Sequence, residues 1–265
     1  MIAPLDADDL WFEDKLRKQV DLLESSEPQV SLVYCWSVHM DGDDRLTGHW
    51  CSAAATDQVL VPLVLRNLLG NASTPLIRRS FLDKVGLYDE SLRSEAAEAT
   101  ADWDLYLRLA SISEFRVVPE FLMGYRLQAG NMSSDLEAIY RAYKVVMQRT
   151  RHRHADLPEE LFRWSEAEFE FYLALLGAHY TGEWNAGFGW FKRALRTDPS
   201  LALQPRFYQR GLEMLLERLG MSRRRHSPRI GPSCRQADLR PMYRTIARKK
   251  KLSLDPFARR VSRYS

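Results

Sequence analysis

The chain has 265 residues, of which 45% are hydrophobic, and this is enough apolar surface for a folded core and two domains. Its 7 Trp and 11 Tyr exclude a typical disordered chain, and no apolar run reaches the ~18–20 residues that span a bilayer. The net charge of +3 hides an asymmetry, because residues 218–265 hold 15 Lys and Arg against two acids. The chain starts without the basic and apolar regions of a secretory signal, so we expect a soluble, cytoplasmic protein.

The first half of the chain alternates patterns typical of strands and helices, which indicates an α/β fold. Its opening patterns predict a strand end, a helix, a buried strand and a turn, at residues 2–5, 11–25, 29–38 and 41–48. The apolar face of that helix should hold Phe12, Leu16, Val20 and Leu23, which fall at helical spacing.

Further along, residues 58–69 predict a helix around Pro62, and residues 70–80 a loop that enters a short strand and is followed by a short helix. Another helix should begin near Asp102, with Leu105, Leu109 and Ile112 on one face. Two short strands broken by Pro119 are expected over residues 115–127. We therefore place an α/β domain over residues 1–134.

After residue 134 the strand patterns stop, and residues 135–221 form an expected helical region. Its helices are predicted at residues 135–150, 158–182, 184–196 and 203–219. The middle pair resembles a tetratricopeptide hairpin, and the residues that carry this resemblance are Leu176, Gly177 and Tyr180 in one helix and Phe191, Ala194 and Pro199 in and after the other. Residues 222–265 form a basic tail that we expect to be loosely ordered apart from a short helix near 236–250.

The pentapeptide LDADD at residues 5–9 places three carboxylates on a loop after an apolar stub. Hard divalent cations prefer oxygen ligands, and Mg²⁺ or Mn²⁺ needs few from the protein when phosphate and water complete the shell. The other interpretation is structural, because Asp8 or Asp9 can cap a helix that starts near Trp11.

Asp102 stands near the predicted start of a helix, in the stretch ADWDLYLRLA. A carboxylate in this position is stabilised as an anion by the helix dipole, and it could act as a general base toward a hydroxyl. A cap or first-turn acid without catalytic function fits the same pattern.

Several segments in order resemble family 2 glycosyltransferases of the GT-A fold: LDADDLW with KL and QV, GN, LIRRSFLDKVGLYDESL, DWDLYLRLA, and FRVVPEFLMGYRL with NMS. The resemblance runs from Ile2 to about Ser134. It implies a GT-A-like (Rossmann-like) α/β partial sheet, here followed by an all-α region. The implied activity is inverting transfer of a sugar from a nucleotide-sugar donor to a saccharide or lipid-linked acceptor.

The resemblance also assigns roles to the acids. Asp6 and Asp8 match the metal-binding DxD motif, with Asp8 as the direct ligand of a Mn²⁺ or Mg²⁺ that holds the donor diphosphate. Asp102 matches the catalytic base, which would deprotonate the acceptor hydroxyl while the metal acts as Lewis acid on the departing diphosphate. Asp9 adds charge beside this motif and is expected in the substrate site.

Three further positions match substrate-binding segments of the family. Gly70 and Asn71 match a loop that borders the sugar and the acceptor. Arg126, with Met132 and Ser133, matches a segment that closes near the diphosphate.

Family members usually begin with a strand–helix–strand unit that binds the nucleotide, and no such unit precedes Met1 in this sequence. We therefore expect the nucleotide-binding N-terminal half to be absent. A partner chain is one possible source of that half. The activity of this chain alone is expected to be impaired. The alternative is a noncatalytic glycosyltransferase remnant that serves as a binding or scaffold module.

The basic tail contains two short positive runs, Arg223–Arg225 and Arg248–Lys251. They could attract anionic lipid headgroups, which would make the chain a peripheral membrane adaptor at the inner membrane. They could instead bind nucleic acid without sequence preference, or simply be solvated. No specific nucleic-acid partner is expected.

Overall fold

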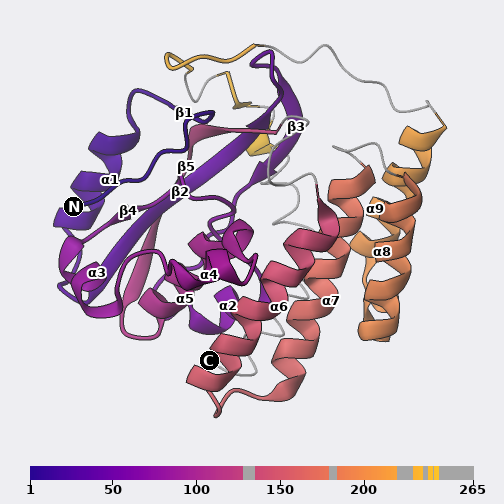
Figure 1. The fold of residues 1–265 in the computed structure, drawn as a ribbon. Coiled ribbons are helices and arrows are strands. Elements are labelled where there is room, and N and C mark those ends of the chain that lie inside the picture. The colour runs from indigo at the N-terminus through magenta and orange to yellow at the C-terminus, as the bar shows by residue number, and fades with distance from the viewer. Residues whose placement is uncertain (128–134, 179–183, 220–228, 235–237, 241, 245–265) are drawn as a thin grey trace.

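The computed structural model describes residues 1–127, 135–178, 184–219, 229–234, 238–240 and 242–244 (Figure 1). A mixed sheet with short helices around it forms one half of the molecule, and longer helices lie beside it (Figure 1). The expected fold class, an α/β part followed by helices, is thus confirmed. In the described part of the chain, no helix combines the length and the apolar character needed to cross a bilayer.

The sheet is built around one parallel strand pair. Its strands are β1 (Leu10–Trp11), β2 (Val30–Met40), β3 (Leu46–Cys51), β4 (Leu76–Ile77) and β5 (Glu114–Arg126). They lie in the order β1-β5-β2-β3, with β4 also paired to β2; β2 and β5 are parallel and every other pair is antiparallel. All of β2 except His39 is buried, which explains why its sequence is apolar with little alternation.

The last strand corrects the expectation of two strands broken by Pro119, because β5 is continuous. The register with β2 shifts at this point, so that Cys35 pairs with Val118 and Trp36 pairs with Phe121. Pro119 and its neighbour form a bulge. A proline lacks the N–H that a central ladder needs, and a bulge is where a strand can place one without ending.

The start of the chain also differs from the expectation. Ile2 makes only an isolated bridge to Ile77, and the predicted turn at residues 41–48 gives way to β3 after Arg45. The first helix, α1 (Lys15–Glu24), begins four residues after Trp11, which belongs to β1.

The buried face of α1 agrees only in part with the predicted one: Phe12 and Leu23 are buried and Val20 is partly buried, but Leu16 is not. Leu16 is 43% exposed, whereas Lys15 and Gln19 are fully buried beside Leu23. The Gln19 amide donates to the carbonyls of Val33 and Thr74, and Lys15 Nζ donates to Gln19 Oε1 at 2.7 Å. Backbone acceptors on the sheet therefore decide which face of the helix is buried.

Between β3 and β5 the chain forms short helices. They are α2 (Leu60–Leu65), α3 (Arg79–Val85), α4 (Ser91–Ser94), a 3-10 turn (Glu98–Thr100) and α5 (Ala101–Ala110). The helix α2 is shorter than the predicted 58–69, with Pro62 in its first turn, where no N–H is needed. The helix α5 begins where expected and buries Leu105 and Leu109, but Ile112 lies beyond its end and is 50% exposed.

The helical region consists of α6 (Leu136–Arg153), α7 (Glu159–Leu176), α8 (Trp184–Thr197), a 3-10 turn (Pro199–Leu203) and α9 (Pro205–Arg218). The predicted pair of neighbouring helices is present as α7 and α8. They approach closely where Gly177 meets Gly187, since a Cβ on either residue would lie 3.4 Å or less from backbone of the other helix. Tyr180, one of the residues of the expected hairpin, lies outside the described residues.

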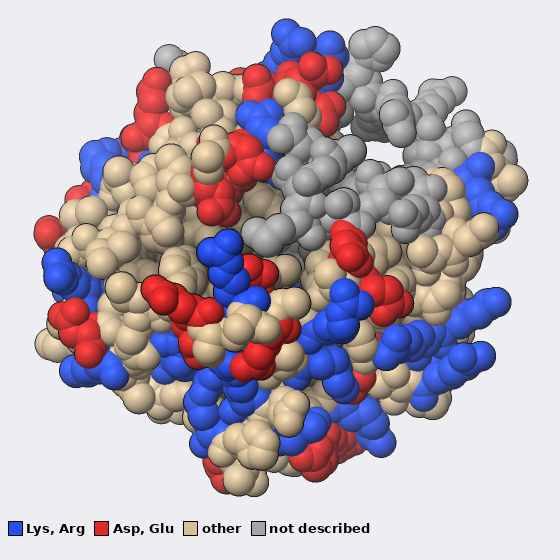
Figure 2. All heavy atoms as spheres, in the orientation of Figure 1, with Lys and Arg blue, Asp and Glu red and all other residues tan. Residues whose placement is uncertain are grey.

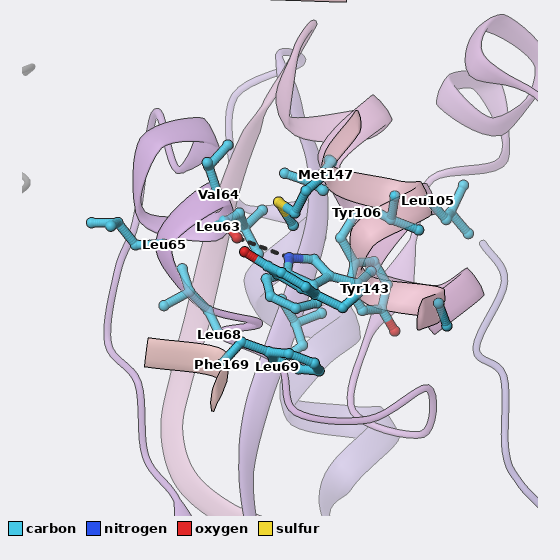
Figure 3. Close-up of a cluster of buried hydrophobic side chains, with 14 of the residues drawn as sticks. Leu63, Val64, Leu65, Leu68, Leu69, Leu105, Tyr106, Tyr143, Met147 and Phe169 are labelled. Atoms are coloured by element: carbon cyan, nitrogen blue, oxygen red, sulfur yellow. Dashed lines mark hydrogen bonds between the residues drawn. The ribbon is translucent and has the colours of Figure 1, made fainter. Parts of the chain in front are cut away.

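The two halves of the molecule share one hydrophobic core. It extends from the sheet residues Leu32 and Phe115 to Met214 of α9. Figure 3 shows its centre, where α2, α5, α6 and α7 meet, with Leu63, Val64, Leu65, Leu68, Leu69, Leu105, Tyr106, Tyr143, Met147 and Phe169. The helices are therefore part of the body that holds the sheet in place.

The described part of the basic tail, residues 229–234, 238–240 and 242–244, packs against the sheet, and the order of the tail as a whole stays a prediction. Ile230, Leu239 and Met242 are buried against Trp36 and Phe121 of the sheet. The backbone N–H of Phe121 also donates to Tyr243 Oη at 2.9 Å. Apolar residues spaced among the basic ones anchor this segment, whereas both positive runs, Arg223–Arg225 and Arg248–Lys251, lie outside the described residues.

The close approach of α7 and α8 leads to a stability prediction. Gly187→Ala should destabilise the chain by about 1–3 kcal/mol, because its Cβ would lie 2.9 Å from the carbonyl oxygen of Ala174, a backbone atom that cannot move alone. Gly189→Ala is the matched control: its Cβ meets nothing within 4 Å, so it should stabilise by up to about 1 kcal/mol. Denaturant unfolding of both variants measures this, and equal effects would contradict the described contact.

Candidate active site

The carboxyl ends of the two parallel strands define the edge where the predicted acids gather. Met40 and Arg126 are the last paired residues of β2 and β5. The acidic loop reaches this edge because Leu10, directly after it, pairs with Gly124. Ligands of open α/β sheets bind outside the carboxyl ends of parallel strands, so the position suits a substrate site.

Ser73 joins the acidic loop to the loop that contains Gly70 and Asn71. Its hydroxyl accepts from the backbone N–H of Asp6 at 2.9 Å, and its carbonyl accepts from Trp11 Nε1 at 2.8 Å. Its own N–H donates to Asn71 Oδ1 at 3.0 Å. The sequence placed the two loops in one site only through the family resemblance, and Ser73 supplies their physical connection.

Asn71 is almost fully buried, and most of its polar atoms have partners. Its backbone carbonyl accepts from Tyr106 Oη at 3.1 Å, while its Nδ2 has no hydrogen-bond partner. Gly70 has φ +80°, a left-handed conformation that favours glycine, and its Cα faces Cys51. The structure thus brings this loop beside Asp6, and its contact with substrate stays a prediction.

The guanidinium of Arg126 fixes the acidic loop against the strand ends. Nε donates to the carbonyl of Asp8 at 2.7 Å, Nη1 to the carbonyl of Asp41 at 2.8 Å, and Nη2 to Asp44 Oδ1 at 2.6 Å. Its backbone N–H donates to Asp9 Oδ1 at 3.0 Å. Arg126 therefore positions the loop, and a direct contact with diphosphate stays a prediction. The accompanying Met132 and Ser133 lie outside the described residues.

The acids of the loop repel one another. Partial burial, followed by the charge of Asp8, raises the pKa of Asp6. Burial also raises the pKa of Asp9 to about 6; hydrogen bonding to Ser73 and Arg126 opposes this rise, and the charges of Asp6 and Asp8 add to it. The loop is therefore a place where negative charge is concentrated at a free-energy cost.

The fit of this loop to a divalent cation follows from its donor atoms. Within the described residues, no group of three or more His, Cys, Asp or Glu side chains is arranged to hold a metal ion by itself. Asp6 and Asp8 offer the carboxylate oxygens that Mg²⁺ and Mn²⁺ prefer, and their mutual repulsion would be relieved by a cation. Asp6 and Asp8 thus fit a cation whose remaining ligands come from a bound phosphate group. By themselves they do not provide a full set of protein ligands.

Asp102 lies at the start of α5, as the sequence predicted. Its Oδ1 accepts from the N–H of Trp103 at 2.7 Å, and its Oδ2 lies 3.4 Å from the donor Asn67 Nδ2. Burial is the main cause that raises its pKa to about 6, these hydrogen bonds lower it, and the charge of Asp6 raises it. The loop of residues 67–73 connects the two acidic segments, because Asn67 donates to Asp102 and Ser73 Oγ accepts from the backbone of Asp6.

A model of the family described as glycosyltransferase-like family 2 matches residues 1–165. The chain belongs to this family. No curated protein matches the chain. The family match extends past Ser134 through α6 and into α7, so that part of the helical region lies within the glycosyltransferase-like segment.

The surface of this glycosyltransferase-like chain is uneven in charge. Figure 2 shows a group of acidic side chains near β1, beside the residues drawn in grey, whereas α8 and α9 present mainly Lys and Arg on this face. An anionic diphosphate would be repelled by the acidic loop alone. Binding a nucleotide sugar here therefore requires a compensating positive charge.

Sequence reasoning missed the side chains that hold the site together. Asn67, Ser73 and Trp11 each contact a predicted residue or its loop. Their partners stand far away in the sequence, and no local pattern distinguishes them from ordinary polar or aromatic residues. Only the folded chain could identify them.

The helix that carries Asp102 is fixed by a buried ion-pair network. Asp104 has no exposed side-chain surface, and it pairs with Arg108 Nε at 2.7 Å and with Arg153 Nη2 of α6 at 2.5 Å. Arg108 also donates to the carbonyls of Val85 and Leu87 at 2.6 and 2.8 Å. One carboxylate thus holds α5, α6 and the segment after α3 together.

Removal of this carboxylate should be costly. Asp104→Ala should lower the free energy of unfolding by about 3 kcal/mol, because it leaves Arg108 largely buried without its counter-ion. Asp83→Ala is the control, since Asp83 forms an exposed pair with Arg79 on α3, and its loss should change stability by less than about 0.5 kcal/mol. Urea unfolding distinguishes the two; a small effect at Asp104 would show that the network does not hold α5.

Proposed function

We propose that this chain transfers a sugar from a nucleotide-sugar donor to a hydroxyl of a saccharide or lipid-linked acceptor, with inversion at the anomeric carbon. The observation that carries the proposal is that the loop of residues 67–73 contacts both Asp102, through Asn67, and the backbone of Asp6, through Ser73. The acidic loop with Asp6 and Asp8 suits binding of the donor diphosphate through a cation. The carboxylate of Asp102 suits deprotonation of the acceptor hydroxyl. The family match supports glycosyl transfer in general and leaves donor and acceptor open.

In the proposed mechanism Asp102 accepts the proton of the acceptor hydroxyl. The oxygen attacks the anomeric carbon from the face opposite the nucleoside diphosphate, which leaves with the electron pair of the broken bond. A pKa of about 6 leaves Asp102 ionised at neutral pH but more basic than an ordinary aspartate, as a general base requires.

The departing diphosphate is the second place where charge develops. Asp8, supported by Asp6, would hold Mn²⁺ or Mg²⁺, which when bound supplies positive charge and Lewis acidity to that leaving group. Arg126 contributes by keeping the carbonyl of Asp8 against the strand ends. Ser73 keeps the backbone of Asp6 next to Asn71.

The donor side predicts metal-dependent nucleotide binding. Titration calorimetry should show that UDP binds in the presence of Mn²⁺ and not after chelation, and that Asp8→Ala weakens this binding by more than about tenfold. Asp21→Ala is the control, because Asp21 is an exposed acid of α1 whose side chain is 66% accessible. Equal binding with and without metal would contradict the role of Asp8. A folded chain that binds no UDP would contradict donor binding by this chain and favour a noncatalytic module.

The acceptor side predicts a pH profile. Because the base must be ionised, kcat/KM should fall about tenfold per pH unit below a pKa of about 6, as measured by release of nucleoside diphosphate from the donor that a nucleotide-sugar screen identifies. Asp102→Asn should abolish transfer and leave UDP binding intact.

The same variant gives a second signature. Since burial disfavours the ionised Asp102, Asp102→Asn should also raise the melting temperature at pH 8. A loss of activity together with a lower melting temperature would indicate that Asp102 is a structural cap.

A further inference from the structure

The helix α9 presents an apolar stripe to solvent. Among the described residues, thirteen large apolar side chains are exposed, and five of them lie within the short segment 203–219. Four of these recur every three to four residues along α9 and at its end: Tyr208, Leu212, Leu215 and Leu219. This spacing places them on one side of a helix, over a length of about 16 Å. The four side chains are 44% to 62% exposed, so they form one continuous surface feature and not a scatter of single residues.

Another side of α9 attaches this helix to the rest of the protein. Phe207 is buried, and its ring is stacked on that of Phe191 of α8, with 4.0 Å between the two centroids. Met214 is fully buried in the main hydrophobic core. A Cβ on Gly211 would lie 3.1 Å from the ring of Phe191, so the two helices are in close contact there. Packing within the described part of the chain therefore does not explain the exposed stripe.

The surroundings of the stripe are cationic. Figure 2 shows mainly Lys and Arg side chains over α8 and α9. Residues 184–225 contain nine Lys and Arg against three acids. Lys192 and Arg196 of α8 are exposed, and Glu213, an acid of α9, is paired with Arg210 at 2.7 Å. An anionic surface would thus be attracted to the same part of the molecule that exposes the stripe.

We propose that the stripe of α9 is a contact surface for an anionic lipid membrane. An amphipathic helix binds such a membrane by placing apolar side chains at the level of the headgroups, while Lys and Arg attract the anionic lipids. Both parts are present here, and Arg223–Arg225 stand within six residues of Leu219 in the sequence. An apolar protein partner would explain the stripe but not the excess of positive charge around it.

This membrane contact goes beyond the proposed function. The stripe lies outside residues 1–165, which match the family, so membership of the family does not account for it. It also does not depend on the chemistry at Asp102, because it concerns where the whole chain is held. A chain held at a membrane would meet acceptors that are anchored there.

Flotation of the full chain with lipid vesicles tests this contact. The chain should bind vesicles of phosphatidylcholine that contain about 30% phosphatidylglycerol, and binding should weaken about tenfold with phosphatidylcholine alone. The double variant Leu212→Gln, Leu215→Gln should weaken binding by more than about tenfold, because less apolar surface leaves water at the membrane. Leu87→Gln is the matched control: Leu87 is a 65% exposed leucine on the segment after α3, and its replacement should leave binding unchanged.

A second double variant tests the electrostatic part. Lys192→Gln with Arg196→Gln should weaken binding to the anionic vesicles by about tenfold and should change binding to phosphatidylcholine alone much less. Equal losses on both kinds of vesicle would contradict attraction to anionic lipids.

A conservative variant separates loss of the stripe from misfolding. Leu212→Phe with Leu215→Phe keeps the stripe apolar and should retain the binding that Leu212→Gln with Leu215→Gln loses. Failure of the wild-type chain to bind anionic vesicles overturns the proposal. Binding that survives Leu212→Gln with Leu215→Gln also overturns it and would assign membrane contact to the basic tail.

Light scattering examines the competing occupant, a second copy of this chain. A wild-type dimer that becomes monomeric in Leu212→Gln with Leu215→Gln, without binding of either protein to vesicles, would overturn the proposal in favour of self-association. These measurements involve neither UDP nor sugar transfer, so failure of the proposed function would leave their result unaffected.

Discussion

The ion pairs of Asp104 are the constraint on which the position of the proposed base depends. A fully buried carboxylate is destabilising by several kcal/mol unless cations and donors surround it. Its partners come from α5 itself and from α6, and Arg108 extends the network to the carbonyl of Leu87. The helix α5 can therefore reach its place only when α6 and the segment after α3 are in theirs, so folding of the helical region and assembly of the active site are coupled.

Three side chains of the first turns of α5 each bind another part of the molecule. Asp102 accepts from Asn67 Nδ2, Trp103 Nε1 donates to the carbonyl of Leu63 at 2.8 Å, and Tyr106 donates to that of Asn71. Each anchor restricts the rotation of the helix, so the carboxylate of Asp102 is held without relying on its own two hydrogen bonds. If Asp102 is the base, as proposed, a carboxylate held in this way before substrate arrives would need little reorganisation during the reaction.

Sequence reasoning recovered what depends on local pattern or on motif order. The apolar run of β2 belongs to this class, as does the alternation that indicates an α/β fold. The roles of Asp6, Asp8 and Asp102 stay predictions. Sequence reasoning failed where contacts between residues far apart in the sequence determine the local structure. Leu16 fits the apolar face of α1 by spacing, yet the acceptors on the sheet select Lys15 and Gln19 for burial. Pro119 ends a strand by local rules, but a bulge accommodates it within β5 because both flanking segments pair with β2. Likewise, Asn67 and Ser73 could be recognised only after folding had joined residues 35 and 67 positions apart.

The buried acids of the candidate site lower the stability of the chain at neutral pH. Burial raises the pKa of Asp9 and Asp102 from the ordinary 3.8 to about 6, so the folded state binds protons more tightly than the unfolded state does. The stabilisation that these groups contribute is complete below pH 3.8 and is lost as the pH rises through about 6. At neutral pH the site therefore holds repelling anions, while the nearby guanidinium of Arg126 is paired with Asp44. A cation and a diphosphate bound together would relieve this repulsion, so under the proposed function donor binding would stabilise the chain.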